Sequence, residues 1–387
     1  MRVLVLTEYY PRSGDPVSGV WVHRQALAAR AEGAQLRVLV LHRPLPSLAS
    51  IRALDLPRAR DVIRQQSHAS IDGIDVEYLR YLAPPRPMSY GSWGAWAAPL
   101  LRRRLAALRA EFPFELIHAH YAVPAGDAAR RAAPQVPLLV SVHGHDVYGA
   151  GRRFRALPAT LSQARLVLAN SAGTARRCVA HGARATRVVH LGTDLEPMPV
   201  RARAGPPALV TVANLVARKR HEDVIRALAL LRERWPELRY VIVGDGPERQ
   251  RLERLAHTLS LESRVEFHGR LAHRQAVELA RQATLFVLPS VEEAFGVGYV
   301  EAMGGGVVAI GAIGEDGPAE IAAAGGGIEL VAPRDPRALA ARIDQLLSDH
   351  TRLAELAAQA RDTVEREFTW RRCGRQTVEA YEEVLRG

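Results

Sequence analysis

Short apolar runs alternate with helical patterns along most of this sequence. Runs such as residues 2–7, 138–142 and 208–213 are rich in Val and Leu and too short for helices, which is typical of buried parallel strands. Because parallel strands need crossover helices between them, the alternation predicts doubly wound α/β units. The other predicted strands are residues 35–41, 116–118, 166–169, 187–190, 240–243, 265–267, 284–288, 307–310 and 328–330.

The chain length predicts two domains. A chain of 387 residues is too long for one ordinary core. Residues 196–207 contain four prolines and no apolar periodicity, and are predicted to be a linker. The predicted domains are therefore residues 1–195 and 208–367, with residues 368–387 forming a helix that packs back on the first domain. Ligands of such sheets bind at the carboxyl ends of the strands, so we expect a site in the crevice between the domains.

Charge and cysteine content exclude several classes of protein. The net charge of +11 comes almost entirely from arginine and indicates contact with phosphates, nucleic acid or anionic lipid. No block of five basic residues and no zinc-finger or RNA-binding signature is present, so we expect no nucleic-acid partner. Cys178 and Cys373 form no CxxC pair, which favours a reducing cytoplasm. No signal peptide and no run of roughly 18 apolar residues is found.

The segment 289–306 carries the strongest chemical signal. Glu293 and Glu301 flank the pair Phe295-Gly296, between an apolar run and a helical pattern. A glycine turn at a helix N-terminus binds anions through backbone N–H groups. Carboxylates accept hydrogen bonds from hydroxyls, so the combination predicts a sugar nucleotide. The alternative is that the two acidic residues only stabilise the helix dipole.

Loops after other predicted strands of the second half add candidate ligands. Lys219 is the only lysine in the chain, and its compact charge suits a pyrophosphate oxygen; the alternative is an ordinary surface lysine. Gly244 lies in a G-D-G-P-E turn that allows close backbone approach. His268 follows the strand at 265–267. Two interpretations are open for it: contact with the base of a nucleotide, or a structural role in the loop.

Together these segments resemble family 4 of the glycosyltransferases, a retaining group with the GT-B fold. The sequence E-A-F-G-V-G-Y-V-E-A-M, from Glu293 to Met303, matches the family pattern of two glutamates separated by seven residues. The segments N-L-V-A-R-K, L-G-T-D and G-D-G-P-E have counterparts in the same order. The resemblance implies two Rossmann-like domains that face each other across a cleft.

The resemblance also implies roles for residues of the second half. Glu293 would hold hydroxyls of the donor sugar, Glu301 the ribose and Lys219 the departing diphosphate. The backbone N–H groups of Phe295, Gly296 and Val297 would meet sugar and phosphate. Asn214 stands where the family usually has arginine, and Arg218 is a candidate for the missing cation.

In the first half the resemblance implies that Gly19 faces the phosphates and that His143 lies at the reacting face of the sugar. His118, His120 and His145 would belong to the acceptor side. His118 and His120 are also consistent with a structural pair at a strand end. Their H-x-H spacing suits metal ligands as well, but no third histidine or carboxylate is identifiable nearby, so we expect no metal.

The implied activity is metal-independent transfer of a sugar from a UDP- or GDP-sugar to a glycan or lipid-linked acceptor. The expected setting is synthesis of cell-envelope polysaccharide or glycolipid, with no cofactor beyond the nucleotide sugar. Two alternatives remain: a GT-B sugar-nucleotide epimerase and a non-catalytic sugar-nucleotide-binding protein.

Residues 93–112 form a predicted amphipathic helix with two interpretations. Its apolar stripe either packs on the sheet or, with arginines opposite, lies on an anionic membrane. The stripe consists of Trp93, Ala97, Leu101, Leu105, Leu108 and Phe112, and the arginines are Arg102, Arg103 and Arg109.

Overall fold

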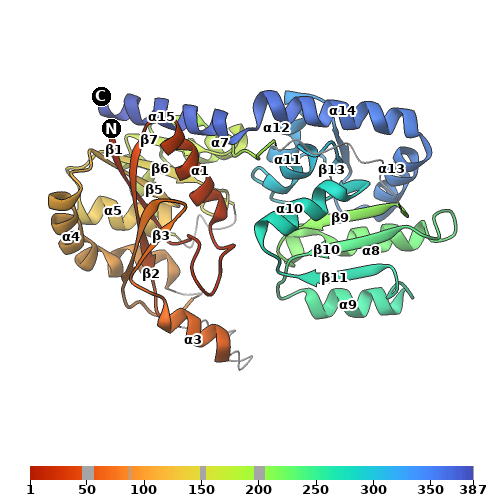
Figure 1. Ribbon diagram of the computed structural model, residues 1–387, viewed down its shortest axis with the longest axis horizontal. Coiled ribbons are helices and arrows are strands. Elements are labelled where there is room, and N and C mark those ends of the chain that lie inside the picture. The colour runs from red at the N-terminus through yellow and green to blue at the C-terminus, as the bar shows by residue number, and fades with distance from the viewer. Residues whose placement is uncertain (46–55, 87–88, 149–153, 196–204, 387) are drawn as a thin grey trace. The chain divides into compact units, whose positions relative to one another are not determined.

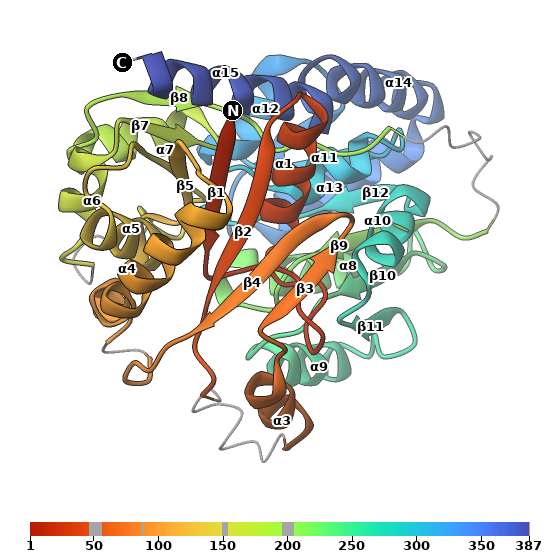
Figure 2. The same ribbon diagram turned by 60° about the vertical axis from the view of Figure 1, so that its left-hand side comes forward.

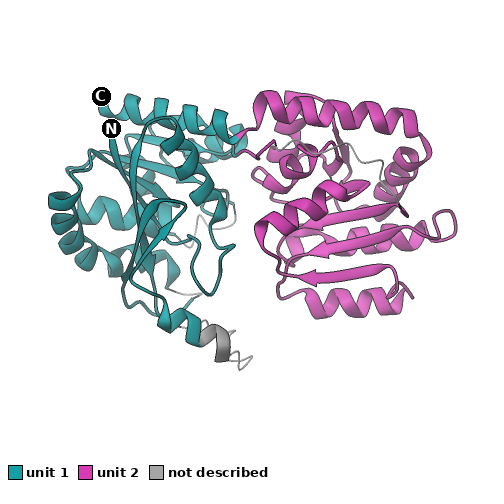
Figure 3. Cartoon of the chain, in the orientation of Figure 1, with its two compact units in different colours: residues 1–191, 370–387 teal, residues 192–369 magenta. Residues whose placement is uncertain are grey.

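The computed structural model describes residues 1–45, 56–86, 89–148, 154–195 and 205–386. The chain forms two compact units: Met1–Leu191 with Trp370–Gly387, and Gly192–Thr369 (Figure 3). Each unit contains one sheet covered by helices, as predicted for an α/β fold. Most of the predicted linker, residues 196–204, lies outside the described residues.

Unit 1 contains an eight-stranded sheet in the order β3-β4-β2-β1-β5-β6-β7-β8. All neighbouring strands are parallel except β3, which runs antiparallel to β4. The strands are β1 (Arg2–Thr7), β2 (Gln35–His42), β3 (His68–Ile71), β4 (Ile74–Arg80), β5 (Leu116–His120), β6 (Leu138–Val142), β7 (Leu166–Ala169) and β8 (Thr186–Val188).

The helices of unit 1 cover both faces of this sheet. Figure 2 shows α1 and α15 on one face and α4 and α5 on the other. The helices are α1 (Val20–Ala31), α3 (Leu56–Arg64), α4 (Trp93–Glu111), α5 (Asp127–Ala132), α6 (Leu157–Gln163), α7 (Ala172–Ala180) and α15 (Trp370–Arg386), with short turns η1 (Tyr90–Ser92) and η2 (Ala122–Gly126).

The β3–β4 hairpin was not predicted from the sequence. Asp72 and Gly73 both have positive φ, of 48° and 73°, which suits a tight hairpin turn. The edge strand β3 alternates between exposed and partly buried positions, and its neighbour β4 alternates between buried and more exposed ones. Both strands therefore lack the continuous apolar run that marks most of the other strands.

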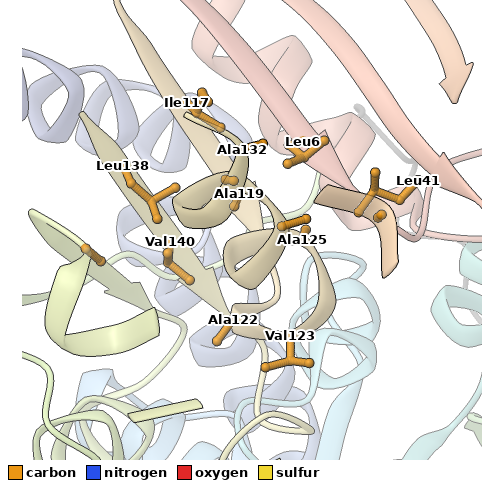
Figure 4. Packing of buried hydrophobic residues seen from close by; sticks show 14 of the residues in the cluster. Leu6, Leu41, Ile117, Ala119, Ala122, Val123, Ala125, Ala132, Leu138 and Val140 are labelled. Atoms are coloured by element: carbon orange, nitrogen blue, oxygen red, sulfur yellow. The ribbon is translucent and has the colours of Figure 1, made fainter. Parts of the chain in front are cut away.

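The core of unit 1 lies between the central strands and the helices α4 and α5. Leu6, Ile117 and Val140 point from β1, β5 and β6 toward small side chains that include Ala125 of η2 and Ala132 of α5 (Figure 4). The predicted stripe of α4 joins this core: Trp93, Ala97, Leu101, Leu105 and Leu108 are all buried. The stripe therefore packs on the sheet and does not face a membrane.

Unit 2 contains a six-stranded parallel sheet in the order β11-β10-β9-β12-β13-β14. Figure 1 shows β9, β10 and β11 side by side. The strands are β9 (Ala208–Val212), β10 (Arg239–Val243), β11 (Val265–Gly269), β12 (Leu285–Val287), β13 (Val308–Ala312) and β14 (Ile328–Val331). The helical elements are η3 (Ala217–Lys219), α8 (His221–Leu230), α9 (Arg249–Thr258), α10 (His273–Gln282), α11 (Val297–Met303), α12 (Asp316–Ala324), α13 (Pro336–Ser348) and α14 (His350–Glu367).

The strand order of unit 2 determines where a ligand can meet its loops. The chain runs outward from β9 to β10 and β11, and then returns to place β12 on the other side of β9. This reversal is a topological switch point, where the loops after two neighbouring strands diverge and leave room for a ligand. The loops that follow β9 and β12 are therefore brought together.

The C-terminal helix α15 is part of unit 1 and packs against α1. Gly374 permits this contact, since a Cβ atom there would lie 2.4 Å from the backbone oxygen of Ala28. Gln25 of α1 donates to Thr377 (3.0 Å), and the hydroxyl of Tyr381 is 2.8 Å from Nδ1 of His118 on β5. No helix among the described residues is long and apolar enough to cross a membrane.

Replacing Gly374 by Val is expected to destabilise unit 1 by ~2–4 kcal/mol, because the added side chain forces α15 away from α1. Urea unfolding followed by circular dichroism measures the change in the free energy of unfolding. Arg375→Ala, an exposed substitution one position away in the same helix, is the control and should change it by less than ~0.5 kcal/mol. Equal stability of both variants would contradict the packing argument.

Candidate functional site

Two loops of unit 2 bring Lys219 and Glu293 into contact at the switch point. Lys219 ends the short turn η3 after β9, and Glu293 follows β12. The two loops are also joined through the backbone, because the N–H of Val291 donates to the carbonyl oxygen of Arg218 (2.8 Å). Residues 74 positions apart in the sequence thus form one site.

The Lys219–Glu293 contact is a buried ion pair. The two side chains are 11% and 8% exposed, and Nζ of Lys219 donates to Oε2 of Glu293. Ser290 donates to the same oxygen (2.7 Å), and Nη1 of Arg218 lies 4.0 Å from it. Oε1 of Glu293 has no hydrogen-bond partner in the part of the chain that the structure describes, so one acceptor oxygen remains for a ligand.

Burial and pairing act in opposite directions on both groups. Burial lowers the pKa of Lys219, although the charge of Glu293 opposes this shift. Burial alone would raise the pKa of Glu293, but Lys219, Arg218 and Ser290 outweigh it and hold that pKa below its ordinary value. Glu293 is therefore ionised at neutral pH, and removing Lys219 would leave its buried charge uncompensated.

The loop that carries Glu293 is held by the next loop along the sheet. The backbone N–H of Glu293 donates to Oε2 of Glu315 (2.8 Å), and its carbonyl oxygen accepts from the N–H of Gly317 (3.0 Å). A Cβ atom at Gly317 would lie 2.3 Å from the carbonyl oxygen of Phe295, so glycine is required there. Glu315, in the segment G-E-D-G-P, is a positioning residue that was not among the predicted site residues.

Gly296 directly precedes α11, which begins at Val297. Gly296 has φ of 86°, and a Cβ atom there would lie 2.4 Å from the ring of Tyr299. Phe295 is buried, with its ring centroid 5.7 Å from that of Phe368. Glycine at position 296 therefore lets the chain turn sharply into the helix after Glu293.

Glu301 has a partner that the sequence analysis did not identify. It lies on α11 with a side chain that is 10% exposed, and its Oε1 is 2.7 Å from Nε2 of His273, the first residue of α10. Buried Arg281 also donates to the carbonyl oxygen of Glu301 (3.1 Å) and to Thr193 (3.2 Å). A histidine 28 residues upstream gives no spacing signal that connects it to Glu301.

The remaining predicted residues of unit 2 lie at the same edge of the sheet. Gly244 follows β10 with φ of 139°, and a Cβ atom there would lie 2.0 Å from the carbonyl oxygen of Ala213. Asn214 and Arg218 are exposed in the loop after β9. His268, at the end of β11, is exposed with Nε2 3.2 Å from Glu266.

In unit 1, Gly19 ends the loop that follows β1 and precedes α1. Its φ is 63°, and a Cβ atom would lie 2.2 Å from the carbonyl oxygen of Tyr9. Glycine is needed here because the loop folds directly over its own backbone.

Three of the predicted histidines form a cluster in unit 1. Nδ1 of His120 lies 3.0 Å from Nε2 of His143, and their rings are stacked. The ring of His118 lies 4.2 Å from that of His120. The prediction that no third histidine lies near the H-x-H pair was therefore wrong, because β5 and β6 are adjacent. Even so, no group of three potential metal ligands occurs among the described residues.

Both ring nitrogens of His118 are already hydrogen-bonded, so neither is free to contact an acceptor substrate. Its Nδ1 pairs with Tyr381 (2.8 Å) and its Nε2 with Ser141 (2.7 Å), and it is 1% exposed. Burial lowers the pKa of His118 to about 3. The acceptor role that the resemblance implied is replaced by a structural one, in which His118 ties α15 to the central strands.

His143 keeps one ring nitrogen without a partner. Its Nδ1 is buried and makes no hydrogen bond within the described residues, and burial lowers its pKa to about 3. Asp146, which is 1% exposed, accepts from the backbone N–H of His143 (3.3 Å) and of Ala122 (3.0 Å). Asp146 thereby fixes the loop that presents His143. Exposed His145 lies with its ring 6.5 Å from that of Tyr90.

Comparison with known proteins identifies the class and then the family. Two parallel-sheet α/β units with glycosyltransferase neighbours define the GT-B fold. Sucrose-phosphate synthase from Thermosynechococcus elongatus aligns with 100% of this chain and 99% of its own, at 21% identity and a TM-score of 0.78. HepE from Anabaena, in complex with UDP and glucose, aligns with 99% and 100% at 23% identity and a TM-score of 0.74.

The chain belongs to glycosyltransferase family 4. It matches "Glycosyltransferase Family 4" over residues 3–197 and "Glycosyl transferases group 1" over residues 196–363. The putative teichuronic acid biosynthesis glycosyltransferase TuaC of Bacillus subtilis is 28% identical over 327 residues, which cover 78% of each chain. Glycogen synthase of Mycobacterium tuberculosis is 28% identical over 100% of this chain and 96% of its own. The predictions of family, fold and hexosyltransferase activity are confirmed.

Asp146 provides a pH test of the unit 1 loop. Burial raises its pKa to about 7, against ~4 in an unfolded chain. Between these values the folded state binds more protons than the unfolded state, so this contribution to stability falls as the pH rises from ~4 to ~7. The free energy of unfolding of the wild type, minus that of Asp146→Asn, should therefore drop by up to ~4 kcal/mol across this window.

Urea unfolding of both proteins at a series of pH values measures this difference. Contributions from the neighbouring histidines are common to both proteins and cancel in the subtraction. A difference that does not change with pH would contradict the assignment.

Proposed function

We propose that this enzyme transfers a sugar, with retention of anomeric configuration, from a UDP- or GDP-sugar to a glycan or lipid-linked acceptor. The observation that carries the proposal is the buried Lys219–Glu293 pair at the switch point of unit 2. A cation and a carboxylate held together at such an edge match a diphosphate that bears a sugar.

Each contact of the pair supports a separate role. Lys219 would turn from Glu293 toward the diphosphate and, with exposed Arg218, balance the charge that develops as it leaves. Oε1 of Glu293, which has no partner among the described residues, would accept from a donor hydroxyl. Glu301, already held at one oxygen by His273, would accept from the ribose with the other.

The proposed step needs no residue as nucleophile. The acceptor oxygen forms a bond to the anomeric carbon on the face from which the diphosphate departs. The bond between that carbon and the phosphate oxygen breaks, and the acceptor proton passes to the departing phosphate. We propose that no metal takes part, because Lys219 and Arg218 provide positive charge where a metal would act. Neutral His143 would lie on the reacting face.

The names of similar proteins support the substrate class. HepE is described with UDP and UDP-glucose, which favours a uridine nucleotide. Relatives named for teichuronic acid and colanic acid biosynthesis favour a polysaccharide acceptor of the cell envelope. We propose that the reaction takes place at the cytoplasmic face of the membrane.

Nucleotide binding and turnover test the donor site. In a thermal-shift panel of UDP, GDP and ADP, we expect UDP or GDP to stabilise the wild type. Lys219→Met should lose this stabilisation, whereas Glu293→Gln should keep it and lose roughly 100-fold or more in donor turnover, because Glu293 contacts the sugar. NMR of the product should show the donor's anomeric configuration.

Arg218→Gln serves as the matched control for the cations of this loop. Its side chain is 44% exposed, against 11% for Lys219, so its effect should be much smaller. If no nucleotide stabilises the wild type, the proposed function is wrong.

A second face of α4 supports membrane contact. Trp96 and Leu100 are 54% and 42% exposed, and Arg103 is exposed one turn further along. Their spacing of four and three residues places them on one face of the helix. Tryptophan, leucine and arginine together on an exposed face suit the interface of an anionic bilayer.

Sedimentation with vesicles that contain phosphatidylglycerol tests this contact. The double substitution Trp96→Ser with Leu100→Ser should reduce the vesicle-bound fraction several-fold, because the inserted apolar area is lost. Leu230→Ser removes a comparably exposed leucine from unit 2 (56%) and should leave binding unchanged. Equal binding of wild type and double variant would exclude α4 as the membrane contact.

A further inference from the structure

A fixed arginine, Arg86, lies beside the loop that follows β1 in unit 1. Its Nη2 donates to Oε1 of Glu8 (2.8 Å) and to the hydroxyl of Tyr9 (2.6 Å). The guanidinium carbon lies 3.8 Å from the ring centroid of Tyr90, whose hydroxyl donates to the other oxygen of Glu8 (2.6 Å). Two hydrogen bonds and one stacked ring therefore hold the guanidinium in a single orientation.

Part of this guanidinium is available to a ligand. A guanidinium has five N–H donors, and both known bonds use Nη2. Nε and Nη1 have no hydrogen-bond partner within the described ranges, and the Arg86 side chain is 43% exposed, whereas Glu8 is 12% exposed. The Glu8 carboxylate is thus mostly buried, whereas a large part of the Arg86 side chain is exposed.

The charge around Arg86 is positive. Arg43 lies over the same Trp93 ring, with its guanidinium carbon 5.2 Å and that of Arg86 5.1 Å from the ring centroid. Glu8 balances one of these two charges. Arg43 donates through Nε and Nη1 to the carbonyl oxygens of Ala83 (2.8 Å) and Leu45 (3.0 Å), whereas Arg86 keeps both Nε and Nη1 without a partner among the described residues.

Arg86 is connected to the histidine cluster by aromatic contacts within unit 1. The ring of Tyr9, which Arg86 contacts, lies 5.1 Å from that of Tyr121, and Tyr121 lies 5.0 Å from His143. Tyr90, on which Arg86 stacks, is also 6.5 Å from His145. A group bound by Arg86 would therefore lie on the side of unit 1 that carries His143.

We infer that Arg86 binds an anionic group of the acceptor, a carboxylate or a phosphate. The inference rests on the proposed function and deepens it, because it assigns the acceptor to the class of acidic or phosphorylated glycans. A pre-oriented guanidinium loses little conformational freedom on binding, and its hydrogen bonds to an anion are charge-assisted. A neutral glycan would gain only the weaker, uncharged hydrogen bonds.

Binding of matched probes tests this inference. Calorimetry with excess UDP, which occupies a nucleotide site, would compare methyl β-D-glucuronide, methyl α-D-glucoside 6-phosphate and neutral methyl α-D-glucoside. We expect the wild type to bind at least one anionic probe roughly tenfold or more tightly than the neutral probe. The carboxylate and phosphate arms distinguish the two sources of charge.

Variants assign the preference to Arg86. Arg86→Gln should abolish the preference, Arg86→Lys should retain part of it, and Arg43→Gln should retain most of it. Circular dichroism would confirm that each variant is folded. The inference is overturned if the wild type shows no preference for, or no binding of, either anionic probe, or if Arg86→Gln keeps the preference. If the anionic-probe test fails but nucleotides still stabilise the protein, only the inference about Arg86 is wrong, and the proposed donor site and function are unaffected.

Discussion

The parallel direction of the strands is the constraint on which the rest of this structure depends. Parallel neighbours cannot be joined by tight turns, so crossovers connect them, and the carboxyl ends of the parallel strands meet at one edge of each sheet. In unit 2 the order β10-β9-β12 places the loops of β9 and β12 together. The Lys219–Glu293 pair follows from this order, since no local interaction would join residues 74 positions apart.

Residues around the buried Lys219–Glu293 pair stabilise it through further hydrogen bonds. An ion pair this deep needs further hydrogen bonds to offset desolvation. Ser290 donates to the same carboxylate, and Glu315 holds the backbone of the loop. The single lysine of an arginine-rich chain is thereby placed against a carboxylate whose second oxygen has no partner among the described residues. In the proposed reaction, a bound diphosphate would compete with Glu293 for Lys219, so that donor binding would be coupled to rearrangement of the pair.

Unit 1 uses its polar groups in a different way. The clustered histidines His118, His120 and His143 lie at or near the ends of β5 and β6, and burial lowers their pKa values and keeps them neutral. His118 joins α15 to the central strands through Tyr381. His143 keeps one nitrogen without a partner among the described residues, and Asp146 holds its loop. A positive charge lies instead next to the end of β1, where Glu8 and the stacked ring of Tyr90 hold the guanidinium of Arg86 in place.

By itself the sequence determined the α/β class, most of the strands and the family, because buried parallel strands are continuous apolar runs and the glutamate motif is contiguous. It also indicated Lys219, Glu293 and Glu301 as site residues, whose roles remain proposals. Only the tertiary structure decided which residues meet: Lys219 with Glu293, His273 with Glu301, His120 with His143. It also showed that the stripe of α4 is buried and that β3 and β4 form an edge hairpin. The physical reason is that contacts between loops follow from strand order, and strand order is set by packing of the whole sheet and not by spacing along the chain.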